Sequence, residues 1–302
     1  HRDLHRLIRR QRQMCIRDCY KGEIMMENKM FCYQCQETVG NQGCSQVGVC
    51  GKTPETAGLQ DLLIDVTKGL AEVINEVRCK GKEINNVYDD QVSENLFITI
   101  TNANFDDQMI IEAVRKTLTL KKELLLQLDD QAVLSNRALW MEMEIEAIEK
   151  RMQMVGVLET ADEDIRSLKQ LITYGLKGMA AYNKHAHALG FRKDEIDRFI
   201  ETTLVKIETS TMSLNDYVAL TMETGKYGVQ VMELLDQANT STYGNPEITE
   251  VNIGVRNNPG ILVSGHDLKD LEMLLEQTKD TGIDVYTHSE MLPAHYLSLI
   301  HI

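Results

Sequence analysis

Apolar residues recur at three- and four-residue steps through most of the chain, from Gly58 to about Asn239. This spacing is typical of helices that bury one face in a core. The first predicted helix carries the apolar positions Leu62, Leu63, Val66, Leu70, Val73 and Ile74. The same spacing predicts a second helix over 89–101 and a third over 106–127. The third follows Asn104, a residue type that commonly caps helix N-termini.

Residues 128–158 are predicted to continue as helix. Methionines recur there, at Met141, Met143 and Met152, together with Ile145 and Ile148. Because methionine is a flexible apolar side chain, this run is interpreted as adaptable core and not as a metal or redox site.

Two segments of the helical region repeat. Residues 62–71 resemble 171–180, and residues 95–101 resemble 203–209, at offsets of 109 and 108. The repeat predicts two successive three-helix bundles, the second over 161–238. His185 and His187 fall near the end of that bundle's first helix, and residues two apart on a helix point away from each other. We therefore interpret them as solvated helix-terminal histidines and not as a metal pair.

The pattern changes after the turn-rich residues 241–246. Gly260–Ser264 is predicted to be a buried strand, Asp267–Lys279 a helix and Ile283–Thr287 a second strand. This βαβ unit would open a doubly wound parallel sheet. His266 and Glu290 each follow one of the strands, so both are expected at the sheet edge where such folds bind ligands. Taken singly, His266 could cap the helix and Glu290 could be a surface carboxylate.

Composition narrows the class of protein. The 302 residues are 43% hydrophobic and 26% charged, as in globular proteins, and no apolar run is long enough to span a membrane. The net charge of −14 argues against broad binding to nucleic acid or anionic membranes.

Both ends of the chain differ from the rest. Residues 1–18 and 297–302 can be encoded by the two strands of a transposon-type sequencing adapter, and Lys21–Ile24 by a ribosome-binding sequence. We therefore expect 1–24 and 297–302 to be adapter or leader, with the native chain running from Met25, Met26 or Met30 to Tyr296. Without the six arginines and two aspartates of residues 1–18, the net charge becomes −18.

Four of the cysteines are candidate metal ligands. Cys32, Cys35, Cys44 and Cys50 form C-x2-C-x8-C-x5-C, with glycines at 40, 43, 48 and 51 that let the loop wrap closely around a metal centre. Disulfides are disfavoured because there is no export signal and few other cysteines. Zinc remains the alternative, although the compact spacing favours iron–sulfur. The solitary Cys79 is interpreted as a small, partly buried residue.

Three blocks identify a family resemblance: MFCYQCQETVGNQGCSQVGVCGK from Met30, GILVSGHDLKDLEMLLEQT from Gly260 and TGIDVYTHSEMLPAHY from Thr281. Together they resemble the hybrid-cluster protein family, also called prismane proteins or hydroxylamine reductases, over essentially all of 30–296. The resemblance implies an iron–sulfur cluster-binding loop over 25–58, a helical domain over 59–240 and the start of an α/β hybrid-cluster domain over 241–296.

The resemblance also implies cofactors and activity. Cys32, Cys35, Cys44 and Cys50 would hold a 4Fe-4S cubane, and His266 and Glu290 would be two ligands of a hybrid iron–sulfur–oxygen cluster. A small N–O substrate, hydroxylamine or nitric oxide, would be reduced there in the cytoplasm of an anaerobe, with electrons from an unidentified donor. The family's other cysteine and glutamate ligands are absent, so we expect this N-terminal part to be inactive alone. The alternatives are a stand-alone iron–sulfur electron-transfer module and a relative of nickel carbon monoxide dehydrogenase.

Overall fold

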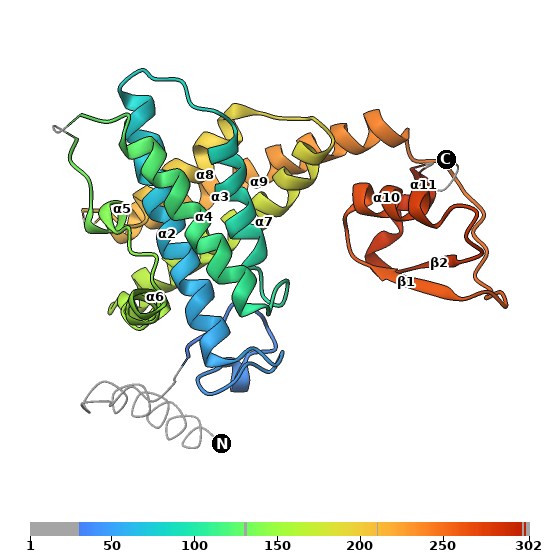
Figure 1. Cartoon of the computed structure of the whole chain (residues 1–302), viewed down its shortest axis with the longest axis horizontal. Coiled ribbons are helices and arrows are strands. Elements are labelled where there is room, and N and C mark those ends of the chain that lie inside the picture. The colour runs from blue at the N-terminus through green and yellow to red at the C-terminus, as the bar shows by residue number, and fades with distance from the viewer. Residues whose placement is uncertain (1–29, 130–131, 210, 298, 300–302) are drawn as a thin grey trace.

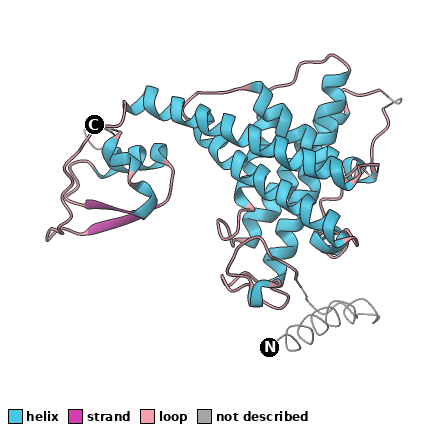
Figure 2. Ribbon diagram, turned by 180° about the vertical axis from the view of Figure 1, so that it is seen from behind, coloured by secondary structure: helices cyan, strands magenta, loops and turns pink. Residues whose placement is uncertain are grey.

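The computed structural model describes residues 30–129, 132–209, 211–297 and 299. The predicted adapter and leader segment 1–24 lies outside these residues. The main elements are α2 Pro54–Cys79, α3 Val87–Ile98, α4 Asp107–Leu125, α5 Asn136–Leu139, α6 Ile145–Met152, α7 Glu163–Ala188, α8 Asp194–Lys206, α9 Leu214–Tyr243, β1 Gly260–Ser264, α10 Leu268–Thr278, β2 Asp284–His288 and α11 Pro293–Tyr296. Most of the chain is therefore helical, with a small parallel sheet at one end (Figure 2).

The long helices start at side-chain caps. Thr53 accepts a hydrogen bond from the Thr56 N–H group at the start of α2, and Pro54 occupies the first turn, where no N–H group is needed. The cap of α4 is Asp106, which accepts from the Met109 N–H group, and not the predicted Asn104. The six apolar positions predicted for the first helix are all buried in α2.

The two helical repeats interleave. α2 and α7 are both 26 residues long and pack against α4 and α9 respectively, whereas α3 lies mainly against α7 and α8 mainly against α2 (Figure 1). One core cluster joins Leu70 and Leu96 of the first repeat to Leu176 and Leu204 of the second. The two predicted three-helix bundles therefore form one helical body, in which the second helix of each repeat packs mainly against the first helix of the other repeat.

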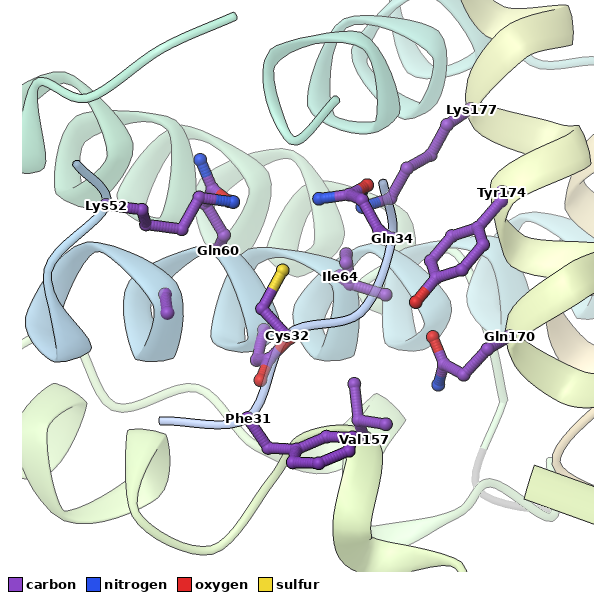
Figure 3. A pocket seen from close by; sticks show the side chains of 12 residues that line it. Phe31, Cys32, Gln34, Lys52, Gln60, Ile64, Val157, Gln170, Tyr174 and Lys177 are labelled. Atoms are coloured by element: carbon purple, nitrogen blue, oxygen red, sulfur yellow. The ribbon is translucent and has the colours of Figure 1, made fainter. Parts of the chain in front are cut away.

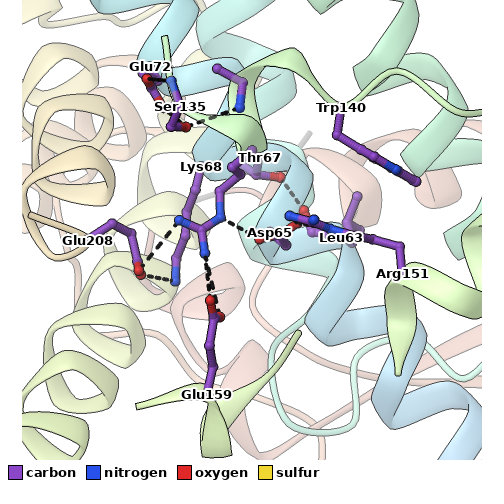
Figure 4. A network of polar contacts seen from close by, with 12 residues as sticks. Leu63, Asp65, Thr67, Lys68, Glu72, Ser135, Trp140, Arg151, Glu159 and Glu208 are labelled. Carbon is purple, nitrogen blue, oxygen red and sulfur yellow. Dashed lines mark hydrogen bonds and ion pairs between the residues drawn. The ribbon is translucent and has the colours of Figure 1, made fainter. Parts of the chain in front are cut away.

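The continuous helix predicted over 128–158 is wrong. In the described residues of this segment the α-helices are the short α5 and α6, and the chain turns to extended backbone at Trp140. The Lys121 ammonium group donates to the carbonyl groups of Arg137 and Trp140, which keeps those carbonyls out of a helix. Arg137 and Arg151, one on each short helix, both bind Asp65 of α2 (Figure 4).

The methionines of this segment do belong to a core. Met141, Met143 and Met152 pack against a second apolar cluster that includes the buried Ile148 and Leu62. This agrees with their interpretation as adaptable packing residues.

The α/β unit follows α9, which extends from the helical body toward it (Figure 1). β1 and β2 pair in parallel, with Ser264 opposite His288 at their carboxyl ends. The unit's apolar core includes Leu297 and Leu299, which are 4% and 1% exposed. Their burial gives no support to excluding 297–302, so the adapter origin of that segment stays a prediction.

Within the described ranges, no helix is both long and apolar enough to cross a membrane.

Candidate metal centres

Backbone pairing brings two of the predicted cysteine ligands side by side. The Cys32 N–H group donates to the Cys44 carbonyl over 3.0 Å, and the Cys44 N–H group donates back to the Cys32 carbonyl over 2.8 Å. The eleven-residue loop between Cys32 and Cys44 is therefore closed at its base. Because of this closure the first and third cysteines of the motif share one end of the loop.

Two glycines leave room for this closure. A Cβ atom on Gly43, whose φ is +137°, would lie 2.8 Å from the Phe31 ring. A Cβ atom on Gly48 would lie 3.0 Å from both the Cys50 sulfur and the Lys52 Cβ atom. The loop thus wraps tightly at the positions where the sequence places glycine, and Gly48 is what allows Cys50 its position.

The thiols are available as ligands. Every cysteine in the described part of the chain is free, with Cys44 buried, Cys32 and Cys35 half-buried and Cys50 exposed. Burial alone would raise the pKa of the Cys44 thiol. Hydrogen bonds from the Val39 and Val49 N–H groups and from Thr38, with the charge of Lys52, outweigh burial and lower that pKa below its ordinary value. A lowered pKa favours the thiolate, which is the form that binds metal.

The four cysteines are compatible with two kinds of metal centre. Structural zinc takes four ligands at about 2.3 Å from one ion. A 4Fe-4S cluster takes one thiolate per iron and so spreads its four cysteines apart. Among residues 30–129, 132–209, 211–297 and 299, no three His, Cys, Asp or Glu side chains converge on one point.

A small cavity lies beside the cysteine loop, with Cys32, Gln34 and Lys177 on its lining (Figure 3). Lys52 is 2% exposed, and its ammonium group donates to Gln60 Oε1 over 2.6 Å. Lys177 is 4% exposed and donates to Gln34 Oε1 over 3.0 Å. Two buried ammonium groups therefore face the side of the loop that carries Cys32.

These lysines are functional candidates that the sequence reasoning missed. Lys177 lies within the repeated Lys-Gly-x-Ala pattern shared by 68–71 and 177–180. A lysine at a core-facing position of a helix is the sequence signal for such a residue, because a buried ammonium group needs polar partners.

The second candidate centre lies at the carboxyl edge of the sheet. His266 follows β1 and Glu290 follows β2, and their Nδ1 and Oε2 atoms are 3.3 Å apart. Both side chains are exposed, at 61% and 59%. Ser264 and His288, in register at the strand ends, extend this polar edge, with Ser264 Oγ and His288 Nδ1 also 3.3 Å apart.

Asp267, and not His266, caps α10. Its carboxylate accepts from the N–H groups of Lys269 and Asp270. His266 is thereby left free to meet Glu290, and the cap interpretation of His266 is wrong. Imidazole nitrogen and carboxylate oxygen are both iron ligands, so the pair can supply two positions of a mixed-ligand centre.

The interpretation of His185 and His187 as solvated histidines is also wrong. His185 Nδ1 lies 3.0 Å from Asp267 Oδ2, with the imidazole 11% exposed, and the ring packs edge-on against Phe97. His187 is 8% exposed and lies 3.0 Å from Asp90 Oδ1. Each histidine is held by a carboxylate from another element, and His185 ties the helical body to the residue next to His266.

Cys79 is exposed, contrary to its interpretation as partly buried. α2 ends at this residue, beyond the last buried position, Val77. Its thiol lies outside both candidate centres.

Comparison with known proteins gives the family. The Prismane/CO dehydrogenase family matches residues 30–301. The chain is 60% identical over 271 residues to a hydroxylamine reductase of Desulfovibrio desulfuricans, covering 90% of this chain and 50% of that protein. It is 56% identical over 276 residues to a hydroxylamine reductase of Clostridium perfringens, covering 88% and 50%. The chain spans about half the length of these relatives. It belongs to the Prismane/CO dehydrogenase family.

Proposed function

We propose that this chain is the N-terminal part of an iron–sulfur oxidoreductase that reduces hydroxylamine to ammonia and water. Cys32, Cys35, Cys44 and Cys50 would hold a 4Fe-4S cluster, and His266 and Glu290 would be two ligands of a hybrid iron–sulfur–oxygen cluster. Family membership and the names of the relatives support the reaction class. The paired Cys32 and Cys44 backbones and the His266–Glu290 contact support the two centres.

The reaction consumes two electrons and two protons per hydroxylamine, breaks the N–O bond and releases ammonia and water. When bound, the clusters would supply the electrons one at a time and an iron site open to a small N–O molecule. The chain's own residues exclude water and position the ligands. The glycine-bearing loop keeps water from the buried Cys44 sulfur, and the Asp267 cap fixes the turn that presents His266.

Glu290 has a further role in the proposal. Its carboxylate is exposed and faces His266 Nδ1, so it can bind metal or accept a proton without disturbing the core. Nitric oxide is a second candidate substrate of the same centre.

The described residues offer only part of the second centre. No cysteine follows Glu290 in this sequence, and the resemblance assigns the remaining ligands to a more distant part of the family's chains. We therefore propose that this chain alone binds the cubane but does not turn over hydroxylamine.

The test is methyl-viologen-linked hydroxylamine reduction, with iron analysis, on the chain reconstituted anaerobically with iron and sulfide. We expect iron to be incorporated, with no turnover. Turnover at the rate of a full-length relative would overturn the proposed incompleteness. Sequencing the contiguous DNA past the codon for Tyr296 separates the alternatives: further cysteine codons favour the reductase, and a stop codon there favours a stand-alone electron-transfer module.

A further inference from the structure

Lys177 joins the cysteine loop to the helical body. Its ammonium group donates to Gln34 Oε1 over 3.0 Å and to the Thr99 carbonyl over 2.9 Å. Gln34 lies between Cys32 and Cys35, and its own amide also donates to the Thr99 carbonyl, over 3.4 Å. One buried cation on α7 thus fastens the turn between two of the proposed cluster ligands (Figure 3).

The counterpart of Lys177 in the first repeat is Lys68. Lys68 reaches the residues just after α8, where its Nζ atom lies 2.6 Å from Glu208 Oε1. Lys177 reaches the equivalent place just after α3, where it meets only the Thr99 carbonyl. Each lysine therefore reaches the end of a helix in the other repeat, but of the two only Lys68, on α2, meets a carboxylate there.

The charge of Lys177 is consequently not offset by direct pairing. In the described part of the chain its Nζ atom forms no ion pair within 4 Å. The largest negative charge acting on it is that of Asp61, which lines the same cavity, and Cys32 also contributes. A buried ammonium group with neutral partners is costly unless negative charge lies nearby. The cysteine loop is next to it, since Cys32 lines the cavity too.

We propose that Lys177 is a positioning residue that holds the Cys32–Cys35 turn through Gln34 and offsets the negative charge of the cluster bound there, raising its reduction potential. This inference rests on the proposed function, since it assumes a cluster on the cysteine loop. Adding one electron makes a cluster more negative, so a fixed positive charge beside it stabilises the reduced form. Net charge and hydrogen bonding are the terms that set cluster potentials.

The test compares Lys177→Gln with the matched control Lys184→Gln, which removes an ammonium group from the same helix at a half-exposed position paired with Glu94. Hydrogen exchange of the cysteine-loop amides is measured on the chain without iron. The cluster potential is measured on the reconstituted chain by dithionite titration followed by electron paramagnetic resonance.

For Lys177→Gln we expect loop exchange to quicken at least fivefold. We also expect the ratio of reduced to oxidised cluster at a fixed potential to fall about tenfold, which corresponds to about 59 mV for one electron. Lys184→Gln should change neither quantity by more than twofold. Equal behaviour of the two variants, in chains that load iron, would overturn the inference while leaving the proposed function standing.

A second variant covers the case in which Lys177→Gln does not fold. Gln34→Leu cuts the link to the loop but keeps the ammonium group, so it should quicken loop exchange and lower the potential less. Unchanged loop exchange in Gln34→Leu would overturn the holding role. If the unsubstituted chain itself takes up no cluster, the proposed function fails, and this inference fails with it.

Discussion

Glu208 links three basic side chains between the two helical repeats, and its removal should be costly. Its Oε1 atom lies 2.6 Å from Lys68 Nζ (Figure 4). Its Oε2 atom lies 3.5 Å from both Arg137 Nη1 and Lys169 Nζ. The side chain is 21% exposed. Glu208→Gln keeps the shape and removes the charge, leaving three cations close together without their shared carboxylate.

The expected loss of stability follows from the pKa of Glu208. Burial would raise it, but Lys68, Arg137 and Lys169 lower it from 4.5 to about 2. Since one pKa unit corresponds to about 1.4 kcal/mol, the ionised carboxylate contributes about 3 kcal/mol to the free energy of unfolding. Because the folded-state pKa is depressed, this contribution is complete above about pH 5 and is lost as the pH falls toward 2.

The assay is urea unfolding followed by circular dichroism between pH 3 and pH 7. Glu208→Gln should lower the free energy of unfolding by about 3 kcal/mol at pH 7, and the difference from the unsubstituted chain should shrink below pH 4. Glu159→Gln is the matched control, because Glu159 meets the same Arg137 but is 50% exposed, so its loss should cost under about 1 kcal/mol. Equal effects of the two variants, or a difference independent of pH, would refute this reasoning.

Three further substitutions test other contacts. Gly48→Ala should push the Cys50 sulfur out of place and at least halve the iron retained after anaerobic gel filtration, whereas Gly178→Ala, which meets no atom within 4 Å, should leave iron content unchanged. Asp267→Ala should lower the protection of α10 amides in hydrogen exchange by about 1 kcal/mol through loss of the cap, and Asp267→Asn should largely restore it. Burial lowers the pKa of Lys121 to about 8, below its value in the unfolded chain, so stability should rise by about 3 kcal/mol between about pH 8 and pH 10.5. Lys121→Met should abolish that rise in urea unfolding.

Local sequence patterns predicted the elements that are stabilised by contacts between residues close together in the sequence. Gly260–Ser264 is the observed β1, but its predicted burial is wrong, because none of its residues is buried and Leu262 is 72% exposed. The first predicted helix has its apolar face buried as expected. The placement of His266 and Glu290 on one sheet edge also followed from the parallel βαβ pattern, because that topology alone brings the carboxyl ends of neighbouring strands together. Their separation of 3.3 Å is consistent with this reasoning.

Contacts between distant segments account for the errors. The apolar spacing of 128–158 is typical of a helix. Two residues outside the segment bind its polar groups instead: Lys121 donates to the Arg137 carbonyl, and Asp65 pairs with the Arg137 guanidinium group. His185 looks like an exposed helix-end residue until Asp267, 82 positions later, is placed beside it. Lys177 was missed for the same reason, since its partner Gln34 lies 143 positions earlier.

The central claim is that the cysteine loop holds a four-iron cluster, and metal analysis with electron paramagnetic resonance tests it most directly. The chain reconstituted anaerobically with iron and sulfide should contain about four iron and four sulfide per chain and give a signal only after reduction. Cys44→Ser should abolish both. About two irons per chain, or one tightly bound zinc that iron does not replace, would contradict the account.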